Sequence, residues 1–401
     1  MSRRTRPVGA LIVVVVVTLG LGVAVTPAWA ADYPTWADVE AAKHNEAAKK
    51  AEIAKIETLV NGLDTEAAEF AKAALIAAEQ YNQAEEALDA AKADAETLQK
   101  SADAAQDKAD TSSAQAGSLI AQLARTGSTD LTFQLLLAGA DDADDLLYRL
   151  GAMNKLSEQS AVVFEQATLD ANEAKALAER AAAARVAREN LATKAQDALT
   201  AANTAAADAE ERAKNQKAVA GELYAQLASL KGTSAATEEA YLQGLAWEAA
   251  QEAIKNPPPP PPPVNPTPPA PNSGAVAGAI AFAQAQVGDP YVTNGMGPNG
   301  WDCAGLTKAS YASVGVNIGP HGSTSQYNTM AAAGRLVPYN EIVAGDLLFY
   351  STGGSTTATK YHVTLYIGNG LMIEAPYPGT NVRVKPVRYG DLVPYAGRPT
   401  P

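Results

Sequence analysis

The stretch NGWDCAGLTKASYASVG, residues 299–315, contains Cys303, the only cysteine among 401 residues. A glycine-rich loop precedes this cysteine, and the residues after it have the composition of a helix. The sequence therefore places the thiol at a helix N-terminus, where unpaired N–H groups and the helix dipole lower a thiol pKa. Since the thiolate is the nucleophilic form, this position predicts attack on a carbonyl group. The alternative, a small buried cysteine, fits poorly beside Asp302 and the polar turns.

The residues around this stretch predict a compact α+β domain over residues 274–401. Residues 275–288 have the pattern of a short amphipathic helix, and residues 303–315 form a second predicted helix. Four segments that alternate apolar and polar residues follow, AGDLLFYS, KYHVTLYIG, GLMIEAPYPG and NVRVKPVRY. Helices followed by antiparallel strands indicate an α+β fold around one core.

A thiol nucleophile needs a base, and the domain offers two histidines. His362 lies in a predicted strand that could aim its ring, whereas His321 lies in a loop and is predicted to be solvated. Glu374 interrupts the next apolar strand, where a buried carboxylate is costly without a partner. Pairing with the second ring nitrogen of His362 would fix the tautomer of that histidine. From spacing alone, an outward-facing Glu374 stays open as the alternative.

The ordered motifs DPYVTNGMGPNGWDCAGLTKASY, AGDLLFY and HVTLYIGNGLMIEAPYPG closely resemble the NlpC/P60 family of cell-wall cysteine peptidases. The resemblance covers nearly all of residues 275–399, and it implies a papain-like fold and a cysteine endopeptidase without a cofactor. It implies that Cys303 is the nucleophile, His362 the base and Glu374 the residue that orients the histidine. It also implies oxyanion and substrate contacts from four further residues, Tyr291, Asp302, Ser323 and Ser325.

The same resemblance implies a substrate and a biological role. Family members cleave the stem peptides of peptidoglycan, usually between D-glutamate and meso-diaminopimelate, and a glutamate third residue resembles the actinobacterial cell-separation endopeptidases. Three departures are present: Ala304 stands where the family has serine, Thr364 stands where a small residue often lies two positions after the histidine, and the loop GPHGSTSQYN lacks the usual arginine. Two alternatives therefore stay open, an amidase or transglutaminase on the same fold and a non-catalytic wall-binding division scaffold or activator.

Residues 31–255 predict an acidic helical arm. No proline occurs between Pro34 and Pro257, and good helix formers dominate this part of the chain. Its apolar face is mostly alanine, which predicts an antiparallel coiled-coil hairpin of modest stability. The arm holds 38 of the 44 acidic residues but only 21 of the 31 basic ones, and this excess argues against nucleic acid as a partner. The arm is long enough to fold over the groove of the domain, so we expect it to restrain activity.

The hairpin must reverse direction near residues 124–156, where glycines and bulky apolar residues concentrate. The candidate docking residues there are Phe133, Leu135, Leu136 and Leu147. They either pack on one another or form a docking surface for another protein. The run LLYRL and the apolar tip resemble coiled-coil division hydrolases and their activators. That resemblance implies recruitment by the division transporter pair FtsE with FtsX.

The remaining segments predict export and a spacer. A basic start, an apolar run and the sequence TPAWA indicate a signal peptide over residues 1–30, with an uncleaved anchor as the alternative. We therefore expect a protein secreted to the cell wall or a periplasm-like space, with no membrane span after cleavage. Residues 256–273 are proline-rich and predict a semi-rigid polyproline linker rather than a ligand for a recognition domain. Three scattered histidines and one thiol predict no metal site.

Overall fold

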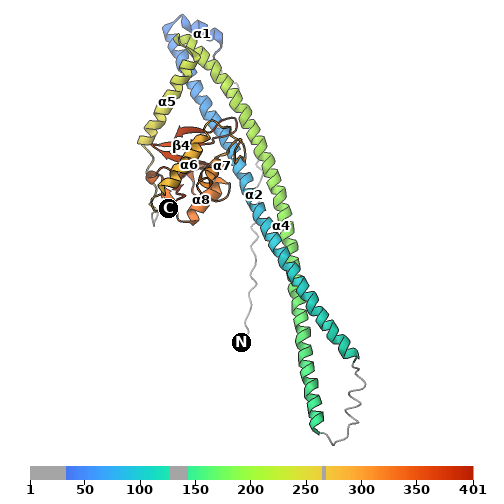
Figure 1. Ribbon diagram of the computed structural model, residues 1–401. Helices are drawn as coiled ribbons and strands as arrows, with labels where there is room; N and C mark the ends of the chain where they lie inside the picture. Colours follow the sequence, from blue (N-terminus) through green and yellow to red (C-terminus); the bar gives the residue numbers. More distant parts are fainter. Residues whose placement is uncertain (1–32, 126–142, 264–267, 401) are drawn as a thin grey trace, which may run out of the picture.

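The computed structural model describes residues 33–125, 143–263 and 268–400, and it shows a long helical arm beside a compact α+β domain (Figure 1). The arm consists of α1 (Trp36–Lys43), α2 (Glu46–Arg125), α4 (Ala143–Lys231) and α5 (Ala235–Lys255). The expected helical hairpin is confirmed, because α2 and α4 run antiparallel and pack along one another (Figure 1). None of the described helices combines the length and the apolar character that a membrane crossing requires.

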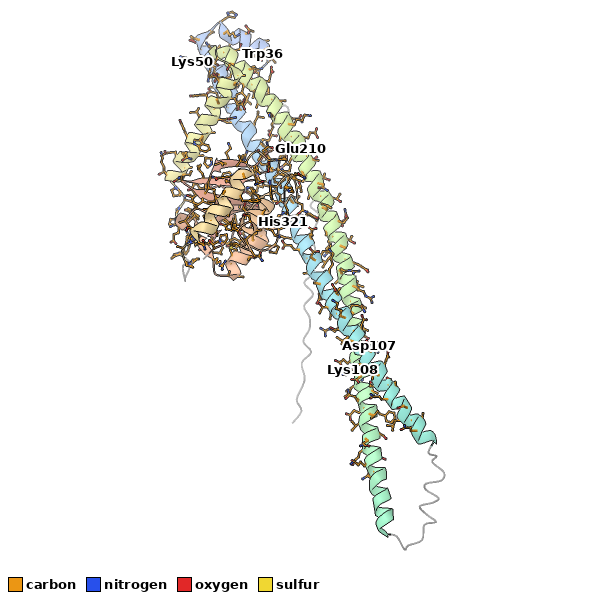
Figure 2. The ribbon with its side chains drawn as sticks, viewed as in Figure 1. Trp36, Lys50, Asp107, Lys108, Glu210 and His321 are labelled. Carbon is orange, nitrogen blue, oxygen red and sulfur yellow. The ribbon has the colours of Figure 1, made fainter. Side chains whose placement is uncertain are left out.

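The seam between α2 and α4 is built largely from alanine. Its buried members include Ala95, Ala102, Ala109, Ala174, Ala181, Ala195 and Ala202. Such small side chains let two helices approach closely, but each buries little apolar area. Lys108 of α2 lies where the two helices cross (Figure 2), and its Nζ is 2.9 Å from a carboxylate oxygen of Asp170 in α4. Many weak contacts along the length of the arm therefore replace a thick core.

Larger apolar side chains gather at the end of the arm where α1 and α5 cover the hairpin. This end cluster contains Val39, Ile56, Val60, Leu63, Leu223, Leu227, Leu230 and Leu242. The helices begin at defined caps: the Thr35 side chain accepts from the Asp38 N–H at the start of α1, and Ser234 caps α5. The end cluster therefore joins all four helices of the arm into one unit.

The expected α+β domain is also confirmed. Its helices are α6 (Ser273–Ala285), α7 (Cys303–Ala312) and α8 (Ser323–Ala332), with two short 3₁₀ turns at Tyr339–Glu341 and Thr352–Gly354. Its strands are β1 (Leu336–Pro338), β2 (Leu347–Ser351), β3 (Lys360–Gly368), β4 (Leu371–Glu374), β5 (Arg383–Pro386) and β6 (Tyr395–Gly397). They form one antiparallel sheet in the order β1-β6-β2-β3-β4-β5.

The register of this sheet sets the position of the candidate catalytic residues. Tyr350 of β2 lies opposite His362 of β3, and Glu374 ends β4 opposite Arg383 of β5. All five residues of β2 are buried, since the strand runs through the middle of the sheet. The sheet therefore brings the histidine and the glutamate onto adjacent central strands.

The domain lies between α2 and α5 and touches both the arm and the linker (Figure 1). Leu75 of α2 belongs to the apolar core of the domain and is only 5% exposed. The hydroxyl of Tyr395 donates to the carbonyl of Pro262 at 3.1 Å, and the hydroxyl of Tyr339 donates to the carbonyl of Pro258. The polyproline segment therefore packs on the domain that it connects to the arm.

Some predicted features fall outside the described residues. These are the signal peptide over residues 1–30 and three of the candidate docking residues, Phe133, Leu135 and Leu136. Leu147 belongs to α4, but its side chain lies outside the described part of the structure. The docking surface at the tip therefore stays a prediction.

Candidate active site

Cys303 is the first residue of α7, as the sequence predicts. Asp302 caps this helix, and its carboxylate accepts a hydrogen bond from the Gly305 N–H at 2.6 Å. Position 305 requires glycine, because a Cβ there would lie 2.0 Å from the carbonyl oxygen of Gly295. The glycine-rich loop can therefore approach the first turn of α7 closely and fix the position of the thiol.

The thiol itself is buried, and its pKa is not lowered as the sequence predicts. Cys303 is 7% exposed, and burial raises the pKa of its thiol to about 12. The negative charges of Asp302 and of Glu79 in α2 act in the same direction. The Val363 N–H and the Ser323 side chain oppose them, and the Ser323 Oγ lies 3.7 Å from the Cys303 Sγ. The prediction was wrong for this arrangement of the chain because desolvation outweighs the helix N-terminus.

His362 and Glu374 form a buried pair. The Nε2 of His362 is 2.9 Å from Oε2 of Glu374, and both residues are 0% exposed. The pKa of Glu374 lies well below its ordinary value, mainly because the nearby guanidinium of Arg388 offsets the cost of burial. An ionised carboxylate only accepts hydrogen bonds, so Nε2 of His362 carries the proton. Nδ1 is thus the ring atom that can accept a proton, and within the described residues it has no hydrogen-bond partner.

The surroundings keep this imidazole neutral. Burial lowers the pKa of His362, and the positive charges of Arg388 and Arg383 lower it further. Glu374 opposes both effects, but the pKa stays below its ordinary value of 6.5. A neutral imidazole can accept a proton from a thiol, so the pair suits general-base chemistry.

The sequence did not lead us to predict the two arginines that bind Glu374. Arg383 Nε lies 3.0 Å from Oε1 of Glu374, and an Arg388 terminal nitrogen lies 2.8 Å from Oε2. The segment NVRVKPVRY was interpreted only as a strand. The pairing of β4 with β5 could have revealed Arg383, because these adjacent antiparallel strands place it directly opposite Glu374.

The structure also places the four residues expected to serve the oxyanion or the substrate. Tyr291 is 7% exposed, and burial followed by the charge of Cys303 raises its pKa well above 10.0, so its hydroxyl stays protonated beside the thiol. Ser323 and Ser325 lie in the first turn of α8, and Ser323 is next to Cys303. Asp302 is 2% exposed, and its carboxylate binds Gly305 and His321, which favours a helix-capping role over substrate binding.

His321 is not the solvated loop residue that the sequence predicts. Its Nε2 lies 2.8 Å from each carboxylate oxygen of Asp302, and its side chain is only 11% exposed. Figure 2 shows His321 where the domain meets α2. His321 is buried because the carboxylate of Asp302, which caps α7, is itself buried and needs a compensating partner.

Helix α2 contributes the residues that lie closest to this site from the arm, and sequence reasoning missed them. Helix α8 has no cap from its own side chains. Instead, the carboxylate of Glu79 accepts from the N–H groups of Ser323 at 2.8 Å and Thr324 at 3.0 Å. Glu86 accepts from the Gly322 N–H at 3.0 Å and from the Ser325 hydroxyl. Two carboxylates of the arm therefore occupy the donors at the start of α8, beside the thiol.

These contacts form one stripe along α2. The contact stripe consists of Lys72, Leu75, Glu79, Gln83 and Glu86, and its spacing of three or four residues places it on one helix face. Lys72 Nζ lies 2.6 Å from an Asp391 oxygen, and Gln83 Nε2 lies 3.1 Å from the Thr324 hydroxyl. A groove of about 670 Å³ remains between α2 and the domain, and its wall includes Arg383 and Arg388.

Comparison with known proteins identifies relatives of the domain that contains this site. The NlpC/P60 family model matches residues 288–394. Peptidoglycan endopeptidase RipA of Mycobacterium tuberculosis is 40% identical over 132 residues, which are 30% of this chain and 26% of RipA. Peptidoglycan endopeptidase RipB of the same organism is 37% identical over 190 residues, which are 43% of this chain and 75% of RipB. Protein P54 of Enterococcus faecium is 40% identical over 119 residues, 29% of this chain and 21% of P54.

The coverage of these relatives differs. The chain spans about a quarter of the length of RipA, whereas it covers three quarters of RipB at 37% identity. The match to RipB is therefore long enough to assign the family. The chain belongs to the NlpC/P60 family.

Proposed function

We propose that this chain is a secreted peptidoglycan endopeptidase that cleaves stem peptides during cell division. The observation that carries the proposal is the His362–Glu374 pair, 2.9 Å apart, on a strand adjoining the helix that begins at Cys303. The names of RipA and RipB, peptidoglycan endopeptidases, support the substrate class. Within that class, the bond between D-glutamate and meso-diaminopimelate is the proposed point of cleavage.

The proposed reaction follows from the ring atoms. Nδ1 of His362 accepts the thiol proton while Sγ of Cys303 attacks the acyl carbonyl. The Cys303 N–H at the start of α7 and the Tyr291 hydroxyl donate to the oxyanion that forms. His362 then protonates the leaving amine, the thioester forms, and the same ring activates water for its hydrolysis. Glu374 holds the Nε2–H and thereby fixes the ring throughout.

We further propose that α2 holds the enzyme in a latent state. The contact stripe lies against the start of α8, beside the thiol, and its carboxylates take the donors of α8 that a substrate carboxylate could use. Hydrogen bonds to charged groups stabilise by roughly 1.5–3 kcal/mol each, so several together hold the arm firmly. A thiol with a pKa of about 12 is a poor nucleophile near neutral pH. Activity therefore requires α2 to move away from the domain.

The other face of α2 explains how one helix serves two neighbours. Ala71, Ala74 and Ala78 are buried, and the guanidinium of Arg212 in α4 lies 3.8 Å from the ring centroid of Phe70. Phe70 thus contacts α4, while the contact stripe faces the domain. The arm can therefore keep its hairpin when the contact stripe leaves the domain.

Peptidoglycan digestion by full-length variants tests both parts of the proposal. We expect the wild type to digest slowly and Cys303→Ala not at all. The double variant Glu79→Ala/Glu86→Ala removes the caps on α8 and should digest at least tenfold faster, since a loss of 1.4 kcal/mol already gives that factor. The matched control is Glu96→Ala/Asp103→Ala, which removes two exposed carboxylates from the same helix.

Each outcome has a separate meaning. Digestion by Cys303→Ala would refute thiol catalysis, and mass spectrometry of the released fragments reports which bond is cut. Equal rates for wild type, the double variant and its control would refute the latent state alone. The proposed FtsE–FtsX-type partner concerns the tip, which lies outside the described residues, and it stays a prediction.

A further inference from the structure

Glu374 has more partners than a residue that only orients a histidine needs. Its Oε2 accepts from His362 Nε2 at 2.9 Å and from Arg388 at 2.8 Å, while Oε1 accepts from Arg383 at 3.0 Å. Glu374 is 0% exposed, so these three donors hold the whole carboxylate in place. Two of them are fixed charges that do not titrate in the working range of an enzyme.

The charges around the carboxylate decide which form the imidazole takes. A carboxylate alone favours the imidazolium beside it, as an opposite charge does for any cation. Here two guanidiniums share that single carboxylate, so an imidazolium would be the third cation around one anion. His362 therefore keeps its orienting hydrogen bond to Glu374. The carboxylate, however, gives an imidazolium at this position little electrostatic stabilisation.

The position of Arg388 is itself fixed by packing. Its guanidinium lies 4.9 Å from the ring centroid of Tyr350, and that ring lies 5.6 Å from the ring of His362. Arg383 is placed by the strand register, directly opposite Glu374. The side chains of Arg383 and Arg388 are 34% and 45% exposed, so their stems border the groove beside α2 and fill no core position.

We propose that Arg388, assisted by Arg383, is a positioning residue that locks Glu374 so that His362 keeps its proton on Nε2 and remains a neutral base. This inference rests on the proposed function and deepens it. The resting site is then a thiol beside a neutral imidazole, and the proton leaves Sγ only during attack on the substrate. Arg388 acts through Glu374 and need not touch the substrate.

Nuclear magnetic resonance of ¹⁵N-histidine in the full-length protein tests this directly, without any substrate. Substitution of His44 and His321 by glutamine assigns the signals of His362 among the three histidines. The groups that act on or contact His362 are Glu374, Arg388, Arg383 and the ring of Tyr350. We expect the Nε2–H tautomer in the wild type. Arg388→Met should raise the His362 pKa by roughly one unit and populate the Nδ1–H tautomer.

Three further variants make the result specific. Arg388→Lys keeps the charge but lacks the planar donors, so we expect a pKa close to that of wild type with a mixed tautomer. Arg383→Met alters a partly exposed side chain and replaces Arg388→Met in the test if that variant fails to fold. We expect Arg383→Met to raise the His362 pKa by a smaller amount. Arg335→Met, at an arginine that binds the carbonyl of Pro399, is the control and should change nothing.

Kinetics supply the second readout, with every variant placed in the Glu79→Ala/Glu86→Ala background. We expect Arg388→Met to lower kcat about tenfold or more with KM unchanged, because the base loses its orientation while the groove is intact. An unchanged tautomer and pKa in both Arg388→Met and Arg383→Met would overturn the inference. If the resonance results appear as expected but the Glu79→Ala/Glu86→Ala protein digests no peptidoglycan, the proposed function fails and the positioning role stands.

Discussion

Two opposing effects act on the thiol of Cys303, and their sizes decide the outcome. A helix N-terminus stabilises a negative charge by about 0.3–1 kcal/mol, rising to about 2 in partly buried sites. Burial and nearby carboxylates raise the thiol pKa from 9.0 to about 12, which corresponds to about 4 kcal/mol. Desolvation therefore outweighs the helix N-terminus in this structure. The position at the start of α7 suits a nucleophile, whereas the burial of the thiol does not.

Alkylation of Cys303 by iodoacetamide as a function of pH tests this balance. Because only the thiolate reacts, the native full-length protein should alkylate very slowly between pH 7 and pH 9. The same protein in denaturant should show the ordinary thiol pKa of about 8.5. A native profile with its midpoint near 8.5 would contradict the burial of the thiol.

The His321–Asp302 pair predicts a stability that depends on pH. Contact with Asp302 raises the pKa of His321 despite the opposing effect of burial. A raised folded-state pKa means that the contribution is complete below the unfolded value of about 6.5 and disappears as pH rises through the folded value. His321→Asn should therefore lower the free energy of unfolding by about 1–3 kcal/mol at pH 5.5 and by less at pH 9.

Urea unfolding at both pH values measures this difference. His44→Gln is the control, since His44 is exposed at the end of α1. A larger loss at pH 9 than at pH 5.5 in His321→Asn would show that the sign is wrong.

At the level of elements, the sequence predicted what each segment forms better than what it contacts. The proline-free arm and the alternating segments predicted helices and strands because propensity and periodicity are local properties. The contact stripe on α2 has the same spacing as any helix face, so periodicity alone could not reveal that it faces the domain rather than α4. His362 and Glu374 were identified by motif order, whereas Arg383 and Arg388 required the register of β4 and β5.

The end cluster contains much of the buried apolar surface of the arm. We therefore expect truncation of a side chain in this cluster to lower the stability of the arm strongly. Leu227 is 0% exposed and packs where α1, α2, α4 and α5 meet. Leu227→Ala should lower the free energy of unfolding of the arm by about 2–5 kcal/mol, whereas Leu227→Met should cost less than about 1.5 kcal/mol. Circular dichroism at 222 nm during urea unfolding reports the arm, because the arm holds most of the helix. Equal effects of the two variants would contradict tight packing at this end.

In the whole molecule the domain is held from two sides, and the two contacts have different roles. The contact stripe of α2 binds the start of α8, beside the thiol, while α5 and the polyproline linker contact the domain elsewhere (Figure 1). Under the proposed latent state, release of α2 exposes Cys303, and release of the linker does not. Under that proposal, a force on the arm would release α2 while the linker still holds the domain.

The rate of Cys303 alkylation at fixed pH tests that asymmetry, because it reports how often the site opens. Glu79→Ala/Glu86→Ala removes hydrogen bonds to charged groups and should raise the rate about tenfold or more. Lys72→Ala removes a partly exposed ion pair worth about 0.2–1 kcal/mol, so its effect should stay below about fivefold. Tyr339→Phe/Tyr395→Phe removes both linker contacts and should leave the rate within about twofold of wild type. If the linker variant opened the site as much as the α2 variant does, the domain would be released as one body, and α2 would not be the element that controls the thiol.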